Sequence, residues 1–259
     1  MHPEHEDIVA RVLAFDHGAV EAMGYRSERR EFGTFWNLDL VRTRGFDPGR
    51  VPEFLEEVVE HYEGRPVGVH LTEGDTFGEL ADALVAHGCT EDDDRNLTIA
   101  HVGEVPDAPH IDGASFEPVD EANLVEAVET KLLAFSAGDA VDEDALAFDL
   151  RLRRGELSGI GAGVLARVDG EPASVLFCHD DPAAPDVSVF LLGTRPAHAG
   201  RRLGERLLVE RIALTRSEGR RTTLINVFAS NVRAVALYRR LGFTDVVSSR
   251  RILRFDPRR

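Results

Sequence analysis

A glycine-bearing turn between an apolar segment and a helix is the stretch of this sequence best suited to bind a phosphate group. Residues 194–204 read TRPAHAGRRLG, and the apolar segment before them ends at Thr194. A turn that opens a helix offers backbone N–H donors and the positive end of the helix dipole, and both bind phosphate. Gly200 can take a positive φ without a Cβ penalty, and Arg201 and Arg202 add positive charge. The simpler alternative is an ordinary connection between a strand and a helix.

A second block of residues follows further along the chain at helical spacing. Ser230 and Asn231 are good N-cap residues for a helix, and Gly242 ends it. The block consists of Asn231, Ala234, Leu237, Tyr238, Gly242 and Phe243. Between the two blocks, residues 222–227 are rich in strand-forming side chains. The segment 191–243 is therefore expected to form a strand, a turn, a helix, a strand and a second helix.

These two blocks resemble the acyl-CoA-binding core of the GNAT superfamily of N-acyltransferases. The cofactor loop of that family has the pattern V-x-P-x-x-[RQ]-G-x-G-x-G, and Pro196, Gly200 and Gly204 match it. Ala199 replaces the usual Arg or Gln, and Arg202 replaces the middle glycine. The family's second pattern, N-x-x-A-x-x-L-Y-x-x-x-G-F, is matched in full. The resemblance implies an α/β (α+β) GNAT fold, in which a mixed, mostly antiparallel sheet is flanked by helices.

The resemblance also implies a site for acetyl-CoA as the cosubstrate. The residues expected to bind it are Leu192, Gly193, Thr194, Gly200, Arg201, Arg202, Leu203, Gly204, Glu205 and Asn231. The backbone of residues 192–194 would run beside the pantetheine arm, and its N–H groups could polarise the thioester carbonyl. Asn231 would hydrogen-bond the pantetheine region or cap its helix, and the two roles are compatible.

Acyl transfer to an amine needs a neutral amine and a proton for the departing thiolate. Tyr238 matches the family's general acid, a phenol near the leaving sulfur, while the alternative is a core tyrosine on the apolar face of its helix. Many family members carry a glutamate where this chain has Asn226. Because an amide cannot accept the amine proton at neutral pH, the base stays unassigned. A water chain or a carboxylate from the N-terminal half could take its place.

The N-terminal part of the chain shows the same order of expected elements as the C-terminal part. Helices are expected over 8–24, 51–62 and 76–87, and strands over 34–41, 66–71 and 97–102. We interpret residues 1–105 as a degenerate GNAT-like domain, 106–114 as a linker rich in Pro, Asp and Gly, and 115–259 as a GNAT N-acetyltransferase domain. An unrelated α/β extension at the N-terminus is the alternative.

The second half is expected to begin with a short strand and a helix that Asp120 caps. A tight turn at Asp169 and Gly170 is expected to join two strands as a hairpin. The expected strands are 116–119, 161–168, 173–178 and 187–194, and the expected helices are 120–135 and 141–153.

The charge balance of the chain excludes some classes of partner. The net charge is −16, and Lys131 is the single lysine among 30 basic residues. Such a surface repels nucleic-acid phosphates and anionic lipid headgroups, so we expect neither nucleic acid nor membrane as a partner. The acidity suits solubility in high salt, or it reflects a GC-rich coding bias. No apolar run approaches the roughly 20 residues of a membrane span, and the N-terminus lacks a signal-peptide layout, so a cytoplasmic location is expected.

The number and spacing of the cysteines and histidines favour structural roles over metal binding. Cys89 and Cys178 are too few for a disulfide framework, and neither has a His or Cys neighbour at zinc spacing. Both are expected to be small buried hydrophobic residues. The ten histidines are scattered, so no metal site is expected.

The expected function is transfer of the acetyl group of acetyl-CoA to a primary amine by direct attack. The amine, on a small molecule or a peptide, is not specified by any shared motif, and both a monomer and a homodimer stay open. Two alternatives remain. One is a non-catalytic acyl-CoA-binding or regulatory module, which the altered loop and the missing base favour. The other is a structural protein that no longer binds CoA.

Overall fold

The structure is a computed structural model that describes residues 48–61, 66–72, 77–136 and 141–258. The expected helix at 8–24 and the expected strand at 34–41 lie outside these residues. The strands are β1 (Val67–Thr72), β2 (Thr90–Glu91), β3 (Asn96–His101), β4 (Ala114–Pro118), β5 (Gly161–Val168), β6 (Glu171–His179), β7 (Asp186–Thr194), β8 (Thr222–Phe228) and β9 (Phe243–Phe255). The helices are α2 (Val51–His61), α3 (Phe77–Ala86), α4 (Leu124–Phe135), α5 (Glu143–Leu157), α6 (Leu203–Ser217) and α7 (Val232–Arg240), with 3-10 turns η1 (Pro48–Arg50) and η2 (Pro196–His198).

The nine strands of the described residues belong to one sheet. Their order is β1-β9-β3-β8-β7-β6-β5-β4, and β2 pairs with β9 on the edge opposite β1. Every pairing is antiparallel except that of β7 with β8, which is parallel. The prediction of a mixed, mostly antiparallel sheet flanked by helices is confirmed.

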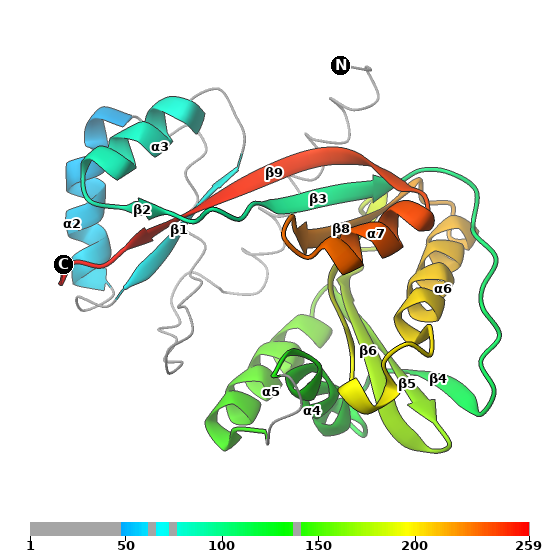
Figure 1. The fold of residues 1–259 in the computed structure, drawn as a ribbon. Helices are drawn as coiled ribbons and strands as arrows, with labels where there is room; N and C mark the ends of the chain where they lie inside the picture. Colours follow the sequence, from blue (N-terminus) through cyan, green and yellow to red (C-terminus); the bar gives the residue numbers. More distant parts are fainter. Residues whose placement is uncertain (1–47, 62–65, 73–76, 137–140, 259) are drawn as a thin grey trace.

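The helices cover both faces of the sheet, as Figure 1 shows. Alternation along the strands sends one set of side chains to α6 and α7, where Val187, Leu207 and Ile225 are buried together. The opposite set faces α4 and α5, where Val128 and Phe177 belong to a second cluster. At the far end of the sheet, α2 and α3 pack against β1 and the end of β9 through a third cluster.

Two strands join the predicted N-terminal half to the predicted C-terminal half. β3 lies between β8 and β9 and pairs with both of them. β9 pairs with β3 over its first part and with β1 and β2 over its second part, so it runs the length of both halves (Figure 1). The predicted boundaries at 105 and 115 therefore separate segments of the chain that share one sheet. The sequence pattern did not predict β2 or β9.

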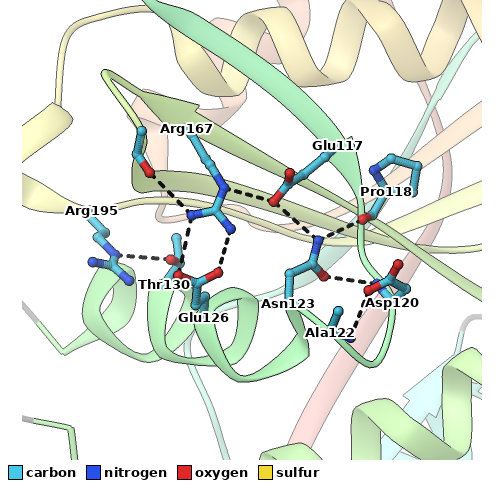
Figure 2. A network of polar contacts seen from close by, with 10 residues as sticks. Glu117, Pro118, Asp120, Ala122, Asn123, Glu126, Thr130, Arg167 and Arg195 are labelled. Carbon is cyan, nitrogen blue, oxygen red and sulfur yellow. Dashed lines mark hydrogen bonds and ion pairs between the residues drawn. The ribbon is translucent and has the colours of Figure 1, made fainter.

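The start of α4 differs from the expectation. The carboxylate of Asp120 accepts a hydrogen bond from the N–H of Ala122 at 2.8 Å, which closes a turn ahead of the helix (Figure 2). The helix begins only at Leu124, and the side chain of Asn123 at the N-cap position accepts from the N–H of Asp120 rather than from the helix. The expected Asp120 cap is therefore wrong, because its short side chain is used within the turn.

The expected hairpin is confirmed between β5 and β6. Asp169 and Gly170 form the two-residue connection with φ values of 52° and 88°. Positive φ at both central residues is the geometry that matches the twist of the flanking strands. Aspartate tolerates this conformation better than most residues do, and glycine tolerates it without penalty.

Both cysteines are buried, as predicted, and both are free thiols. Burial raises the pKa of Cys89 to about 11 and that of Cys178 to about 12. Both thiols therefore stay protonated at neutral pH and act as small apolar side chains. Within the described ranges, no helix is long and apolar enough to cross a membrane.

Candidate active site

β7 and β8 pair only over their first residues and then separate. The pairing joins 186–189 to 222–225 and goes no further. Phe177 of β6 pairs with Leu191, whereas the next residue, Cys178, pairs with Val189, so Phe190 is the extra residue of a β-bulge. The sheet therefore opens between residues 190–194 and 226–228, and we call this region the β7–β8 opening.

Backbone groups of β7 face this opening. The N–H of Arg195 donates to the carbonyl of Ala173 on β6 at 2.9 Å. In an antiparallel pair, hydrogen-bonded and non-hydrogen-bonded residues alternate, so Gly193 also directs its N–H toward β6. The N–H and C=O groups of Leu192 and Thr194 then point away from β6, into the β7–β8 opening. These are the groups that the predicted contact with a pantetheine arm requires.

The turn that leads from β7 into α6 leaves N–H groups available. Gly200 has a φ of 79°, in the region that favours glycine. No side chain caps α6. The N–H groups of Leu203, Gly204 and Glu205 donate to no other group within the described part of the chain. Three such donors at the positive end of a helix form a binding position for an anion.

Arg202 occupies the N-cap position of α6 in the left-handed conformation, with φ 61° and ψ 20°. This conformation costs a residue with a Cβ roughly 1–2 kcal/mol, and the family pattern has glycine here. The Arg202 guanidinium donates two hydrogen bonds to the Glu205 carboxylate, at 2.9 and 2.5 Å. The side chain therefore lies along the first turn of α6 and helps to offset the backbone cost.

Glu205 is shared between two arginines from different helices. Its side chain is only 7% exposed, and Arg240 of α7 lies 3.5 Å from the carboxylate. The hydrogen bond from Arg202, together with the charge of both arginines, lowers the pKa of Glu205. With Arg201 exposed on the same turn, the helix start keeps an excess of positive charge. Nothing in the sequence pattern pointed to Arg240, which reaches Glu205 because α6 and α7 share one hydrophobic cluster.

Two glycines bring neighbouring elements close to the opening. A Cβ added at Gly204 would lie 3.6 Å from Leu192, which is ordinary contact, so α6 and β7 meet at two predicted site residues. A Cβ added at Gly193 would lie 2.9 Å from the Cβ of Ala134. The end of α4 therefore packs directly on Gly193, and only glycine fits there without a shift.

Asn231 directly precedes α7, and Tyr238 lies within this helix. The side chain of Asn231 accepts a hydrogen bond from the N–H of Ala234 at 3.2 Å, so the expected helix cap is confirmed. Tyr238 is 6% exposed, and its ring packs against Phe243. Burial raises the pKa of Tyr238 to about 12, so the phenol is protonated at neutral pH. Its hydroxyl makes no hydrogen bond to another described residue, which leaves its proton available.

Asn226, at the position of the family's base, is bound by a residue from the N-terminal half. The hydroxyl of Thr98 on β3 donates to Oδ1 of Asn226 at 2.7 Å. The two residues are 128 positions apart in the sequence, and they meet because β3 pairs with β8. No sequence pattern could have identified Thr98.

The bulge residue Phe190 packs against two side chains on the α4–α5 face, the half-buried His179 and the buried Arg153. The His179 ring lies 4.4 Å from the Phe190 ring, centroid to centroid. The Arg153 guanidinium lies 4.9 Å from the same centroid and also pairs with Glu156. Burial, with the charge of Arg153, lowers the pKa of His179 to about 4. Nearby, Lys131 pairs with the buried Asp149 between α4 and α5.

A network of hydrogen bonds connects α4 to the sheet and to the first residue of the loop after β7 (Figure 2). Arg167 of β5 donates to Glu117 of β4 at 2.8 Å and to Glu126 of α4 at 2.5 Å. The hydrogen bond from Arg167 to Glu126 lowers the pKa of Glu126. Arg195, the first residue after β7, donates to the hydroxyl of Thr130 at 3.0 Å. The network fixes α4 beside the end of β7, where Gly193 lies.

The chain matches one known family by sequence. Residues 126–243 match the model of the Acetyltransferase (GNAT) family. Mycothiol acetyltransferase of Salinispora arenicola (strain CNS-205) is 39% identical over 103 residues, which cover 37% of this chain and 33% of that protein. The chain therefore spans about a third of the length of this curated relative.

Solved structures show the same fold over most of the chain. A GCN5-related N-acetyltransferase from Sphaerobacter thermophilus superimposes with a TM-score of 0.59 at 19% identity, covering 84% of this chain and 70% of that one. A tandem GNAT protein from the clavulanic acid biosynthesis pathway superimposes with a TM-score of 0.61 at 17% identity, covering 83% and 71%. The fold of this chain is the GNAT fold.

Proposed function

We propose that this protein transfers the acetyl group of acetyl-CoA to a primary amine by direct attack. The observation that carries the proposal is the β7–β8 opening, which lies beside the uncapped start of α6. The opening offers backbone donors for an acyl chain, and the helix start offers donors for an anion. The match of residues 126–243 to an acetyltransferase family supports the same reaction class.

The residues around α6 fit the parts of acetyl-CoA. The N–H groups of Leu203, Gly204 and Glu205 would bind the pyrophosphate, and Arg201 and Arg202 would add charge. Because Arg202 and Arg240 already neutralise Glu205, this carboxylate does not oppose an anion. Leu192 and Thr194 would hydrogen-bond the pantetheine arm through their backbone groups. Asn231 caps α7, and this use of its oxygen leaves the amide N–H₂ for the same arm.

Tyr238 would act as the general acid of the reaction. The uncharged amine attacks the thioester carbonyl, so a C–N bond forms and the C–S bond breaks. The departing sulfur takes the phenolic proton of Tyr238, and the product nitrogen releases one proton to water, which restores the phenol. Its raised pKa keeps the phenol protonated through the neutral range.

A second candidate function is a non-catalytic acyl-CoA-binding or regulatory module. Asn226 favours it, because an amide in place of a glutamate removes the usual proton acceptor. Arg202 favours it as well, since its side chain and strained backbone stand where the family has glycine.

The proposal also includes a division of the chain into three parts. Residues 1–105 form a degenerate GNAT-like domain, residues 106–114 form a linker, and residues 115–259 form the catalytic domain. One of the structural neighbours is described as a tandem GNAT protein. In this chain the N-terminal half would serve by supplying β3 to the catalytic sheet rather than by binding a cofactor of its own.

Calorimetry with acetyl-CoA, followed by an amine screen for release of CoA thiol, tests the proposal. Wild type should bind, Gly200→Glu should not, and Gly155→Ala on α5, outside the proposed site, should bind like wild type because its methyl group has room. Tyr238→Phe should keep the affinity and lower kcat by about 10²-fold. Binding without turnover in wild type would favour the regulatory module, and no binding would exclude both functions.

A further inference from the structure

The acceptor side of the β7–β8 opening is built from both halves of the chain. Asn226 is the first residue of β8 beyond its pairing with β7. Ile225 and Val227, its neighbours in the strand, pack with α6 and α7. Alternation therefore sends the Asn226 side chain to the other face of the sheet. Because Tyr238 belongs to the α6–α7 face, Asn226 and the proposed acid lie on opposite sides of the opening.

Thr98 determines which atoms of Asn226 are available. Thr98 is 1% exposed and lies directly across from Asn226 in the strand register. Its hydroxyl donates to Oδ1 at 2.7 Å, so the amide oxygen points toward β3. The amide nitrogen then points away from Thr98. This nitrogen makes no hydrogen bond to the described residues, and it is not fully enclosed. The site thus presents N–H donors and no proton acceptor at this position.

The register identifies the side chains that share this face of β8 and β3. Those next to Asn226 are Leu224, Phe228, Asn96, Thr98, Ala100 and Ser248. None of these six can take a proton from an amine at neutral pH. The same register also gives this face Asp245 and Arg250 of β9, opposite Ala100 and Asn96, and β3 separates β9 from β8. Asp186 lies on this face at the start of β7, opposite Thr222. On the β7 side, Phe190 is backed by His179 and by the cation Arg153. With a pKa of about 4, His179 is too weak a base for this task.

We propose that Thr98 is a positioning residue that holds Asn226 as a hydrogen-bond donor, and that the acceptor of this site is an amine of the α-amino class that is already partly uncharged near neutral pH. The inference rests on the proposed acetyl transfer and deepens it. An α-amino group has a pKa near 7.7–8.0, so about a tenth of it is uncharged at pH 7. A lysine-type amine has a pKa near 10.4, so only about one molecule in 2,500 is uncharged. Its greater nucleophilicity offsets part of this difference.

Isomeric pairs of acceptors test the substrate class. Nε-acetyl-lysinamide offers a free α-amino group, and Nα-acetyl-lysinamide offers a free ε-amino group on the same framework. Further pairs that differ in side chain extend the panel. At pH 7 we expect the α-amino isomer to show a kcat/KM at least tenfold higher. Its kcat/KM should rise with unit slope up to the pKa of the amine. A lysine-type isomer that reacts equally well would overturn the inference. So would a wild-type pH profile of kcat/KM that levels off below the pKa of the amine.

Substitutions at Thr98 and Asn226 test the positioning role. Thr98→Val removes the hydroxyl, and we expect kcat to fall about tenfold with an unchanged Kd for acetyl-CoA. Thr98→Ser keeps the hydroxyl and should stay within about threefold of wild type. Asn226→Glu places a carboxylate base at position 226. The pH profile of kcat/KM should then show an additional break, and the ratio of kcat/KM between the α-amino and ε-amino isomers should become smaller. A Thr98→Val enzyme with wild-type kcat would refute the role of Thr98.

The readouts separate this inference from the proposed function. If acetyl-CoA does not bind, or if no amine in the panel is acetylated, the transferase proposal itself fails. If lysine-type amines are acetylated as well as α-amines, acetyl transfer stands and only the inference about the acceptor fails. The thermal midpoints of both Thr98 variants show whether a loss of kcat reflects a loss of folding.

Discussion

At the scale of single residues, Arg202 is the position where this chain departs furthest from the loop that it resembles. A glycine there would adopt a φ of 61° freely, whereas arginine adopts it at a cost. The ion pair with Glu205 and the αL strain act in opposite directions on stability. The carboxylate is 7% exposed, but the Arg202 side chain is 60% exposed, so solvent screens the pair as it does a surface ion pair.

A pair of substitutions separates these two effects. Arg202→Ala and Arg202→Gly both remove the ion pair, but only glycine also removes the strain. We expect the glycine variant to be more stable than the alanine variant by about 1 kcal/mol. Urea denaturation of the two variants measures the difference. Equal stabilities would show that φ at this position relaxes when the side chain is removed.

The lowered pKa of His179 predicts that the protein loses stability in mild acid. Its pKa of about 4 in the folded protein lies below the usual value of 6.5. Between these values the unfolded chain binds a proton that the folded chain does not, so stability is complete above about pH 6.5 and falls toward pH 4. The shift corresponds to a loss of up to about 3 kcal/mol. His179→Phe keeps an aromatic ring against Phe190, and denaturation at pH 7 and pH 4.5 should show a smaller decrease than in wild type.

At the scale of elements, the two helices on the α4–α5 face begin differently. The Asp142 carboxylate accepts a hydrogen bond from the N–H of Ala145 at 2.8 Å and caps α5. Asp120 closes a turn before α4 and caps nothing. We therefore expect Asp142→Ala to cost about 1 kcal/mol and to lower the thermal midpoint by roughly 2–4 °C. Asp120→Ala, as the matched control, should cost less. A larger effect at Asp120 would contradict this assignment.

The local elements were predictable because each has a local cause. Gly219 and Gly242 take positive φ where α6 and α7 end, and Asp169 with Gly170 forms the expected hairpin turn. Asn231 caps α7 as its residue type suggests. The expected boundaries of the helices and strands differ from those observed by a few residues, most at α4 and α5, because caps and turns compete at the ends.

The acceptor side of the site was not predictable for the opposite reason. The contact of Thr98 with Asn226 depends on β3 being inserted between β8 and β9, and nothing in the local sequence specifies a strand partner 128 residues away. The contact of Arg240 with Glu205 likewise depends on how α6 packs beside α7. The bulge at Phe190 is set by its pairing with β6 and by the side chains behind it.

At the scale of the whole molecule, the exchange of strands makes the two halves depend on each other. Without β3, both β8 and β9 would expose unpaired edges in the middle of the sheet. Without the second part of β9, β1 and β2 would lose their partner and α2 and α3 would lose the buried Leu253. Neither half keeps a complete sheet when it is separated from the other.

This interdependence predicts that the protein unfolds as one unit and survives cleavage of its linker. A protease site placed between Val105 and Pro109 should be cut without separating the fragments, because β3 and β9 keep their pairings. The cut protein should elute as one species and keep a single urea transition. Amide exchange in β1 and in β5 should then report similar opening free energies. Two separate transitions, or fragments that part after cleavage, would show that the halves fold independently despite the shared sheet.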